Sequence, residues 1–277
     1  MKLSICNEVF SGMGVTEVFP HVKRFGYDGV EIAPFTIASN VEKISIEKRR
    51  EIRRKALENG IEVVGTHWVL VCDKNVNFFK DSGETSREAV GYLARVIEFT
   101  SEIGGRIVVF GSPKQRSIPS DEVFKRAWDS AVSAFRDIGD SAKEKTVVLC
   151  IEPLSKDQTN FINNVGEAIK FLKDVAHENI RLILDVRSMC DEKRSFKNMI
   201  KEAGPYLKHF HANDCNGYIP GSGSANYKEI VQGLLETNYS GYLSVEVFDF
   251  KPNAETIAVR SRDNLKKFFR EYGNIAL

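Results

Sequence analysis

Residues 146–185 decide the class of fold; they read TVVLCIEPLSKDQTNFINNVGEAIKFLKDVAHENIRLILD. The runs 146–152 and 180–185 are short, apolar and rich in β-branched side chains, a composition that favours buried strands. Between them, residues 165–175 repeat apolar side chains with the period of an amphipathic helix. A buried strand, a helix and a second buried strand in this order predict a parallel βαβ unit.

The same alternation runs from the first residues of the chain to the last. Strands are expected at 2–7, 29–33, 61–67, 106–110, 146–152, 180–185, 207–211 and 242–247. Helices are expected at 46–59, 84–103, 121–143, 165–175, 227–237 and 254–272. Eight strands of this kind, with no GxGxxG sequence after the first, favour a closed barrel over an open doubly wound sheet. The sequence therefore predicts one (β/α)8 TIM barrel, as a single domain over residues 1–277.

The overall composition is that of an ordinary globular protein, with 42% hydrophobic and 28% charged residues among 277. Because 39 basic residues stand against 38 acidic ones, the net charge is +1, which argues against nucleic acid or an anionic membrane as a partner. No apolar run approaches the length of a membrane span, and residues 1–5 form no signal-like segment. We expect a cytoplasmic protein that acts on a small molecule, and a homo-oligomer remains open.

The five cysteines are odd in number, widely spaced and without a CxxC pair; they are Cys6, Cys72, Cys150, Cys190 and Cys215. This pattern argues against a disulfide framework and against a thiolate zinc site. We therefore expect mostly buried free thiols, as in a reducing compartment.

Ionisable side chains stand at the ends of the last four expected strands. Barrel enzymes carry their reactive groups at the carboxyl ends of strands, and the residues found there are Glu152, Asp185, His211 and Glu246. Each lies about one βα unit after the previous one, so a barrel would direct all four into one mouth. Three carboxylates and one imidazole suit Mn²⁺ best, with Mg²⁺ or Co²⁺ as alternatives, and suit a tetrahedral structural zinc less well. A single acid at a strand end more often caps a helix, so the hypothesis depends on all four.

Short motifs surround these residues along nearly the whole chain. They are IEPL (151–154), TNF (159–161), LDV (184–186), HFHAND (209–214), PGSG (220–223) and SVE (244–246), with GSPKQR (111–116) after the fourth strand. In these motifs the chain resembles the sugar-phosphate isomerase/epimerase superfamily of xylose-isomerase-like barrels. The resemblance is greatest to its D-tagatose 3-epimerase-like and hydroxypyruvate-isomerase-like branches.

The resemblance implies a divalent-metal-dependent isomerase or epimerase of carbohydrates. It makes Glu152 and Glu246 both metal ligands and acid/base groups that act on a proton beside a carbonyl. The metal would stabilise the enediolate that forms. Return of the proton to the opposite face gives an epimer, and return to the neighbouring carbon gives an isomer.

Two departures from the family pattern lie where the substrate would be held. Ser188 stands where relatives commonly carry a histidine, and Gly217 stands where epimerases often place an arginine. The run 221–226, GSGSAN, also replaces the usual Gly-x-Gly-His-x-Asp pattern. These differences predict that ordinary free ketoses are poor substrates.

Further substrate-binding candidates are His67, at the third strand end, Lys114 and Arg116 after the fourth, and Ser188. His67 could bind a hydroxyl or be structural, and the two basic residues could hold a phosphate or carboxylate or be merely solvated. Asn7 and Glu31 lie near the first two strand ends without a specific role.

Three other functions remain open. The same metal site could serve a lyase or deglycosidase that expels a leaving group from a keto-sugar. A barrel-type metal hydrolase or endonuclease is less expected, because five histidines and a net charge of +1 suit a multi-metal nuclease poorly. A non-catalytic, metal-stabilised sensor is the remaining alternative.

Overall fold

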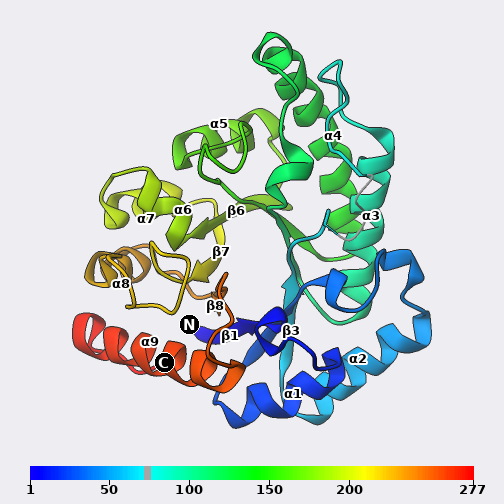
Figure 1. The fold of residues 1–277 in the computed structure, drawn as a ribbon. Helices are drawn as coiled ribbons and strands as arrows, with labels where there is room; N and C mark the ends of the chain where they lie inside the picture. Colours follow the sequence, from blue (N-terminus) through cyan, green and yellow to red (C-terminus); the bar gives the residue numbers. More distant parts are fainter. Residues whose placement is uncertain (72–75) are drawn as a thin grey trace.

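Eight parallel strands close into a barrel in the computed structural model, which describes residues 1–71 and 76–277. Each strand pairs with its neighbours in chain order, and β8 pairs with β1. Figure 1 shows the strands at the centre with the helices around them. The strands are β1 (Lys2–Cys6), β2 (Gly29–Ile32), β3 (Glu62–Thr66), β4 (Ile107–Phe110), β5 (Val148–Ile151), β6 (Ile180–Asp185), β7 (Leu207–Ala212) and β8 (Tyr242–Val245). The predicted TIM barrel is confirmed.

The helices outside this barrel are α1 (Val15–Arg24), α2 (Ile46–Glu58), α3 (Arg87–Glu102), α4 (Phe124–Glu144), α5 (Val165–Val175), α6 (Val186–Asp191), α7 (Phe196–Ala203), α8 (Tyr227–Glu236) and α9 (Ala254–Gly273). Short 3-10 helices are η1 (Asn7–Phe10), η2 (Pro34–Thr36), η3 (Val41–Lys43), η4 (Pro113–Arg116) and η5 (Asp121–Val123). The six expected helices are present, with ends shifted by up to three residues. Helices α1, α6 and α7 lie outside the expected ranges; α1 contains Pro20, and α6 and α7 span six and eight residues.

Several strands end earlier than expected, and this matters for the side chains that follow them. β5 ends at Ile151 and β8 at Val245, so Glu152 and Glu246 are the first residues beyond their strands. β3 ends at Thr66, which places His67 one residue beyond it. Residues just past the last ladder pair belong to the mouth of the barrel, where reactive side chains of this fold lie.

Alternate strand residues face the barrel interior and the helices. Val64, Ile107, Val109, Cys150 and Ile183 form a small apolar cluster of their own. Outward residues such as Phe110 join the large core beneath the helices, where aromatic rings stack edge to face. This division into two packed layers is what a parallel sheet buried on both faces requires.

One expectation about the cysteines is wrong. Cys190, in α6, forms a disulfide with Cys215, in the loop after β7, and the Cα atoms are 5.6 Å apart. β6 and β7 are neighbours in the barrel, so residues that follow their ends come together although they are far apart in sequence. Cys6 and Cys150 are buried free thiols, as expected, whereas Cys72 lies outside the described residues.

In the part of the chain that the structure describes, each helix is too short or too polar to cross a membrane.

Candidate metal centre

The barrel brings the four predicted ligands together. Asp185 ends β6 and is the ladder partner of His211 in β7, while Glu152 and Glu246 follow β5 and β8. Each residue offers one ligand atom, and these atoms all lie within 4.8 Å of one another. All four side chains are buried. The predicted convergence is therefore present in the structure.

His211 is oriented by a carboxylate behind it. Its Nε2 lies 3.2 Å from Glu31 Oε1, while its Nδ1 lies 3.0 Å from Glu246 Oε2 and 3.6 Å from Glu152 Oε1. Nδ1 is buried and makes no hydrogen bond. Burial lowers the pKa of His211, but the charges of Glu246 and Glu31 raise it well above its usual range, so without a metal the imidazole carries a proton on Nδ1. A cation among the carboxylates would displace that proton and take the lone pair of Nδ1, while Nε2–H stays donated to Glu31.

Glu31 is fully buried between two histidines of β7. Its Oε2 lies 2.7 Å from His209 Nε2 and 3.3 Å from His211 Nε2. Burial would raise the pKa of Glu31, but the charges of His209 and His211 hold that pKa well below its usual range. Glu31 is therefore a fixed negative charge directly behind the proposed ligands.

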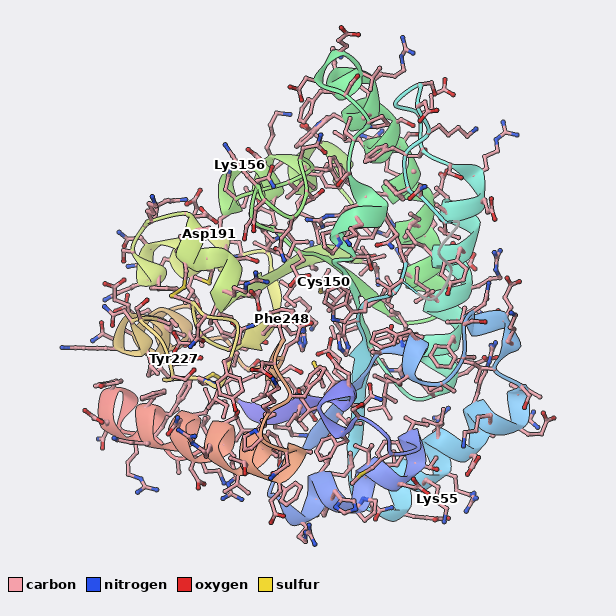
Figure 2. The ribbon with its side chains drawn as sticks, viewed as in Figure 1. Lys55, Cys150, Lys156, Asp191, Tyr227 and Phe248 are labelled. Carbon is pink, nitrogen blue, oxygen red and sulfur yellow. A yellow bond between two sulfur atoms is a disulfide. The ribbon has the colours of Figure 1, made fainter. Side chains whose placement is uncertain are left out.

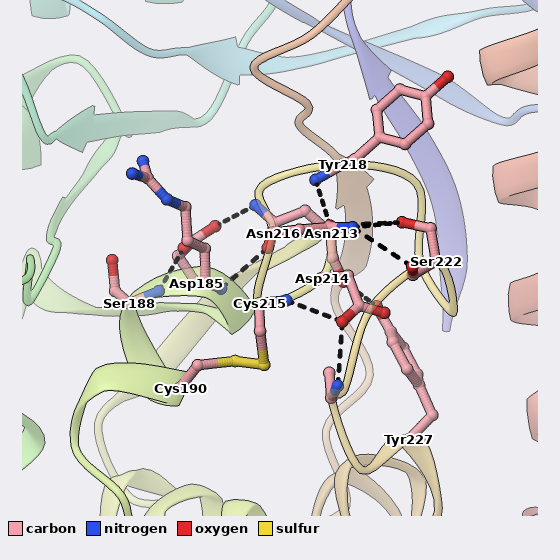
Figure 3. The surroundings of a disulfide bond; sticks show 12 residues. Asp185, Ser188, Cys190, Asn213, Asp214, Cys215, Asn216, Tyr218, Ser222 and Tyr227 are labelled. Carbon is pink, nitrogen blue, oxygen red and sulfur yellow. Dashed lines mark hydrogen bonds between the residues drawn. A yellow bond between two sulfur atoms is a disulfide. The ribbon is translucent and has the colours of Figure 1, made fainter.

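Asp185 is held by hydrogen bonds to its neighbours. Its Oδ1 accepts from the backbone N–H of Ser188 at 2.9 Å and its Oδ2 from Asn213 Nδ2 at 2.6 Å, so it caps the start of α6 (Figure 3). Burial, together with the charges of Glu152 and Glu246, raises the pKa of Asp185 to about 7. Crowded carboxylates of this kind fit a bound cation, which would offset their repulsion.

A second buried network adjoins the ligands. His67 Nε2 lies 2.8 Å from Glu8 Oε1, and His67 Nδ1 lies 3.5 Å from Glu31 Oε1. Burial lowers the pKa of His67, but the charges of Glu8, Glu31 and Glu246 and the Glu8 hydrogen bond raise it to about 9. Glu8 and Glu31 were not among the expected site residues, and His209 was noted only as part of the motif at residues 209–214. The available signal was position: Glu8 follows β1, Glu31 lies next to the end of β2, and His209 precedes His211 by two residues on the same face of β7.

A pocket opens beside the cluster and contains about 380 Å³ of empty space, including its mouth. Its walls include Glu152, Asp185 and Glu246 from the cluster, with His67 and Ser188 beside them. The aromatic residues Trp68 and Phe248 also line it, with ring centroids 6.4 Å apart and edge to face. Figure 2 labels Phe248 within the ring of helices. The pocket therefore opens directly onto the proposed metal ligands.

The remaining substrate-binding candidates divide into two groups. His67 and Ser188 line the pocket, whereas Lys114 is exposed on η4 and is not among the described residues that line it. Arg116 is fully buried, and its guanidinium donates to the carbonyls of Phe110 at 2.9 Å, Glu152 at 2.6 Å and Ile162 at 3.4 Å. The expectation that Arg116 holds a substrate anion is thus wrong, because η4 turns its side chain inward to support the Glu152 loop.

The loop after β7 is built around Asp214. Its Oδ1 accepts from the backbone N–H groups of Cys215 and Ala225, at 2.8 and 2.9 Å, and its Oδ2 accepts from that of Gly221 at 2.8 Å. Figure 3 shows this loop beside the Cys190–Cys215 bond, with Asn213 reaching Asp185. The loop therefore connects the cluster to the rim of the barrel.

Fold and site together define a TIM barrel with a buried cluster of three carboxylates and one histidine at its mouth. The xylose isomerase-like TIM barrel family model matches residues 19–268, and the chain belongs to this family. The expected superfamily is thereby confirmed.

Several relatives carry names of sugar epimerases. A D-psicose 3-epimerase of Agrobacterium fabrum is 29% identical over 234 residues, which cover 82% of this chain and 77% of the relative. A 3-dehydro-D-guloside 4-epimerase of Escherichia coli is 25% identical over 275 residues, covering 96% and 98%. A crystal structure of D-psicose 3-epimerase in the presence of D-fructose superposes with a TM-score of 0.84 at 24% identity, covering 98% and 99%. This last likeness concerns the fold.

Proposed function

We propose that this chain is a divalent-metal-dependent epimerase or isomerase of a keto-sugar or a sugar derivative. The observation that carries the proposal is the convergence of Glu152, Asp185, His211 and Glu246 beside one pocket. The sugar epimerases among its relatives, which match over most of their length, support an enzyme that acts on carbohydrates. The oxygen-rich ligand set favours Mn²⁺, with Mg²⁺ and Co²⁺ as alternatives.

The residues of the chain divide the chemistry between them. A bound divalent cation supplies electrostatic stabilisation for negative charge on the substrate oxygens. Glu152 and Glu246 reach the pocket from different strands, so one carboxylate can take the proton beside the carbonyl and the other can return one. His67 and Ser188, also in the pocket wall, are placed to bind substrate hydroxyls.

The alternatives are less well supported. The relatives are epimerases, which favours return of the proton over elimination of a leaving group. The names of these relatives are likewise those of epimerases and not of hydrolases, which disfavours a multi-metal hydrolase. Four further expectations stay predictions: one domain over residues 1–277, a cytoplasmic location, the lack of a nucleic-acid partner and a possible homo-oligomer.

Exchange of hydrogen with solvent tests the proposal. The metal-free protein is loaded with Mn²⁺, Mg²⁺ or Co²⁺ and incubated in deuterated water with a panel of keto-sugars and keto-sugar derivatives. We expect one deuterium at the carbon that changes configuration, or at the carbon that receives the proton in isomerisation, and loss of turnover when a chelator removes the metal.

Glu246→Gln provides the matched variant, because it removes the carboxylate charge and keeps the shape. It should lose most turnover while still binding some metal, as measured by calorimetry. Turnover without deuterium in the product, combined with an active Glu246→Gln variant, would contradict the proposal.

A further inference from the structure

Arg187 is a charged residue of the pocket that the proposed chemistry does not use. It is the second residue of α6, it is half-buried, and it lines the pocket together with Glu152, Asp185 and Glu246. Among residues 1–71 and 76–277, no group accepts a hydrogen bond from its guanidinium, and no carboxylate forms an ion pair with it. Its five N–H donors are therefore available to a ligand.

The position of Arg187 is fixed by its surroundings. Its backbone N–H donates to Asn213 Oδ1 at 2.9 Å, and the Nδ2 of the same Asn213 donates to Asp185. The Cys190–Cys215 bond ties the other end of α6 to the same loop (Figure 3). The main chain that carries Arg187 is thus held directly against a proposed metal ligand.

The side chain of Arg187 is also held in place. Its guanidinium carbon lies 5.0 Å from the centroid of the Phe248 ring, which leaves the N–H edge free. A Cβ at Gly217 would lie 2.9 Å from Phe248 Cδ2 and 3.2 Å from Arg187 Cδ, and Gly217 has a φ of +70°. The missing side chain at Gly217 is what leaves room for Arg187 and Phe248 to stack.

The charges around the pocket indicate what this arginine binds. In the described wall, every carboxylate belongs to the metal cluster. Of the remaining polar side chains there, His67 is paired with Glu8 and Ser112 accepts from the backbone N–H of Leu70, whereas Ser188 and Gln158 are neutral. No hydrogen bond engages the Ser188 hydroxyl or the Gln158 amide in the described residues. A planar guanidinium beside neutral donors matches the two oxygens of a carboxylate or phosphate better than a single hydroxyl.

We infer that Arg187 makes this pocket selective for a keto-sugar that carries an anionic oxygen group, a carboxylate or a phosphate, in addition to its carbonyl and hydroxyl groups. The inference rests on the proposed function, which supplies the keto-sugar part of the substrate. Arg187 is the residue that determines this specificity, and Gln158 and Ser188 are neutral side chains that would bind the anionic group together with it.

Three probes that differ at carbon 6 test the selectivity: D-fructose, D-fructuronate and D-fructose 6-phosphate. Their dissociation constants are measured by calorimetry with the full-length, Mn²⁺-loaded protein, and epimer formation is followed separately. We expect at least one anionic probe to bind about 10- to 100-fold more tightly than D-fructose, the usual effect of a charge-assisted bidentate contact. The anionic probe that binds more tightly shows whether the pocket selects a carboxylate or a phosphate.

Substitutions assign the selectivity to one residue. Arg187→Gln should bring the anionic probes to within about threefold of D-fructose, while Arg187→Lys should keep part of the preference. Lys156→Gln is the control, because it removes a positive charge from an exposed residue that lies outside this pocket, beside α5 (Figure 2). The control should keep the full preference, and metal affinity should be unchanged in all three variants.

The outcomes separate the two claims. If neither anionic probe binds more tightly than D-fructose, or if Arg187→Gln weakens all three probes equally, the inference is overturned even when D-fructose is epimerised. If the Arg187-dependent preference is present but turnover leaves no deuterium in the product and Glu246→Gln stays active, the proposed epimerase function is overturned and the selectivity stands.

Discussion

Glu31 lies wholly buried behind the metal cluster and holds His211 by its Nε2. Partners of this kind set the tautomer and the orientation of a ligating histidine. The sequence alone gave no reason to prefer Glu31 over other acids near strand ends. Its role appears only when β2 and β7 face each other across the barrel interior, because residues 31 and 211 are far apart in the chain.

Glu31→Gln should lower the affinity of the protein for Mn²⁺ by about 10- to 100-fold, because a neutral amide no longer stabilises the donating imidazole. Calorimetric titration of the metal-free protein measures this directly. Glu229→Gln is the control; that carboxylate accepts from Ser195 Oγ at 2.6 Å, on α8. Equal Mn²⁺ affinity in wild type and Glu31→Gln would show that Glu31 does not position His211.

At the scale of elements, the loops after β4 and β5 support each other through Arg116. Its guanidinium joins the end of β4 to the residue that follows β5, Glu152, and to Ile162 further along. Burial lowers the pKa of Arg116 to about 10, with Glu152 opposing the shift. Arg116 is thus a buried cation that bonds to backbone carbonyls. It supports the geometry of the site but does not line the pocket where a substrate would bind.

Arg116→Met should reduce the free energy of unfolding by about 2–4 kcal/mol, since the carbonyls would lose their charged donor in a buried place. Lys114→Met, on the same 3-10 helix but exposed, should change it by less than about 0.5 kcal/mol. Urea unfolding of the metal-free proteins measures both values. The structure indicates that Arg116 supports the loop and does not bind the substrate. If Arg116→Met were as stable as wild type but bound anionic ligands poorly, Arg116 would instead be a substrate-binding residue.

The disulfide between α6 and the loop after β7 acts on the same scale. It joins two cysteines 25 residues apart, and a covalent loop of this size restricts the unfolded chain. We expect Cys190→Ser with Cys215→Ser to lower the free energy of unfolding by about 3 kcal/mol in the absence of reductant.

Mn²⁺ affinity should stay close to that of wild type in this double variant, because the proposed ligands lie on or next to strands. Urea unfolding and calorimetry give the two values, and reduced wild type is the matched control. A double variant as stable as the oxidised wild type would show that the bond does not form in the protein.

At the scale of the whole molecule, closure of the sheet is what assembles the site. Strands β5 to β8 are successive in the chain and in the barrel, so the residues at their ends meet at one mouth. The order of the strands and the residues at their ends can both be predicted from the sequence. For this reason the four proposed ligands could be predicted together. The number of strands followed from the same alternation of buried and amphipathic segments.

The sequence by itself determined the barrel, its strands and the four converging side chains, because these depend on local periodicity and on the order of segments. Only the tertiary structure decided which charged groups face the ligand. Arg116 turns inward and Arg187 lines the pocket, although both follow strand ends and look alike in the sequence. The partners of Glu31 and the pairing of Cys190 with Cys215 were decided in the same way. Side-chain direction and contacts across the barrel depend on loops and on packing, which no local pattern specifies.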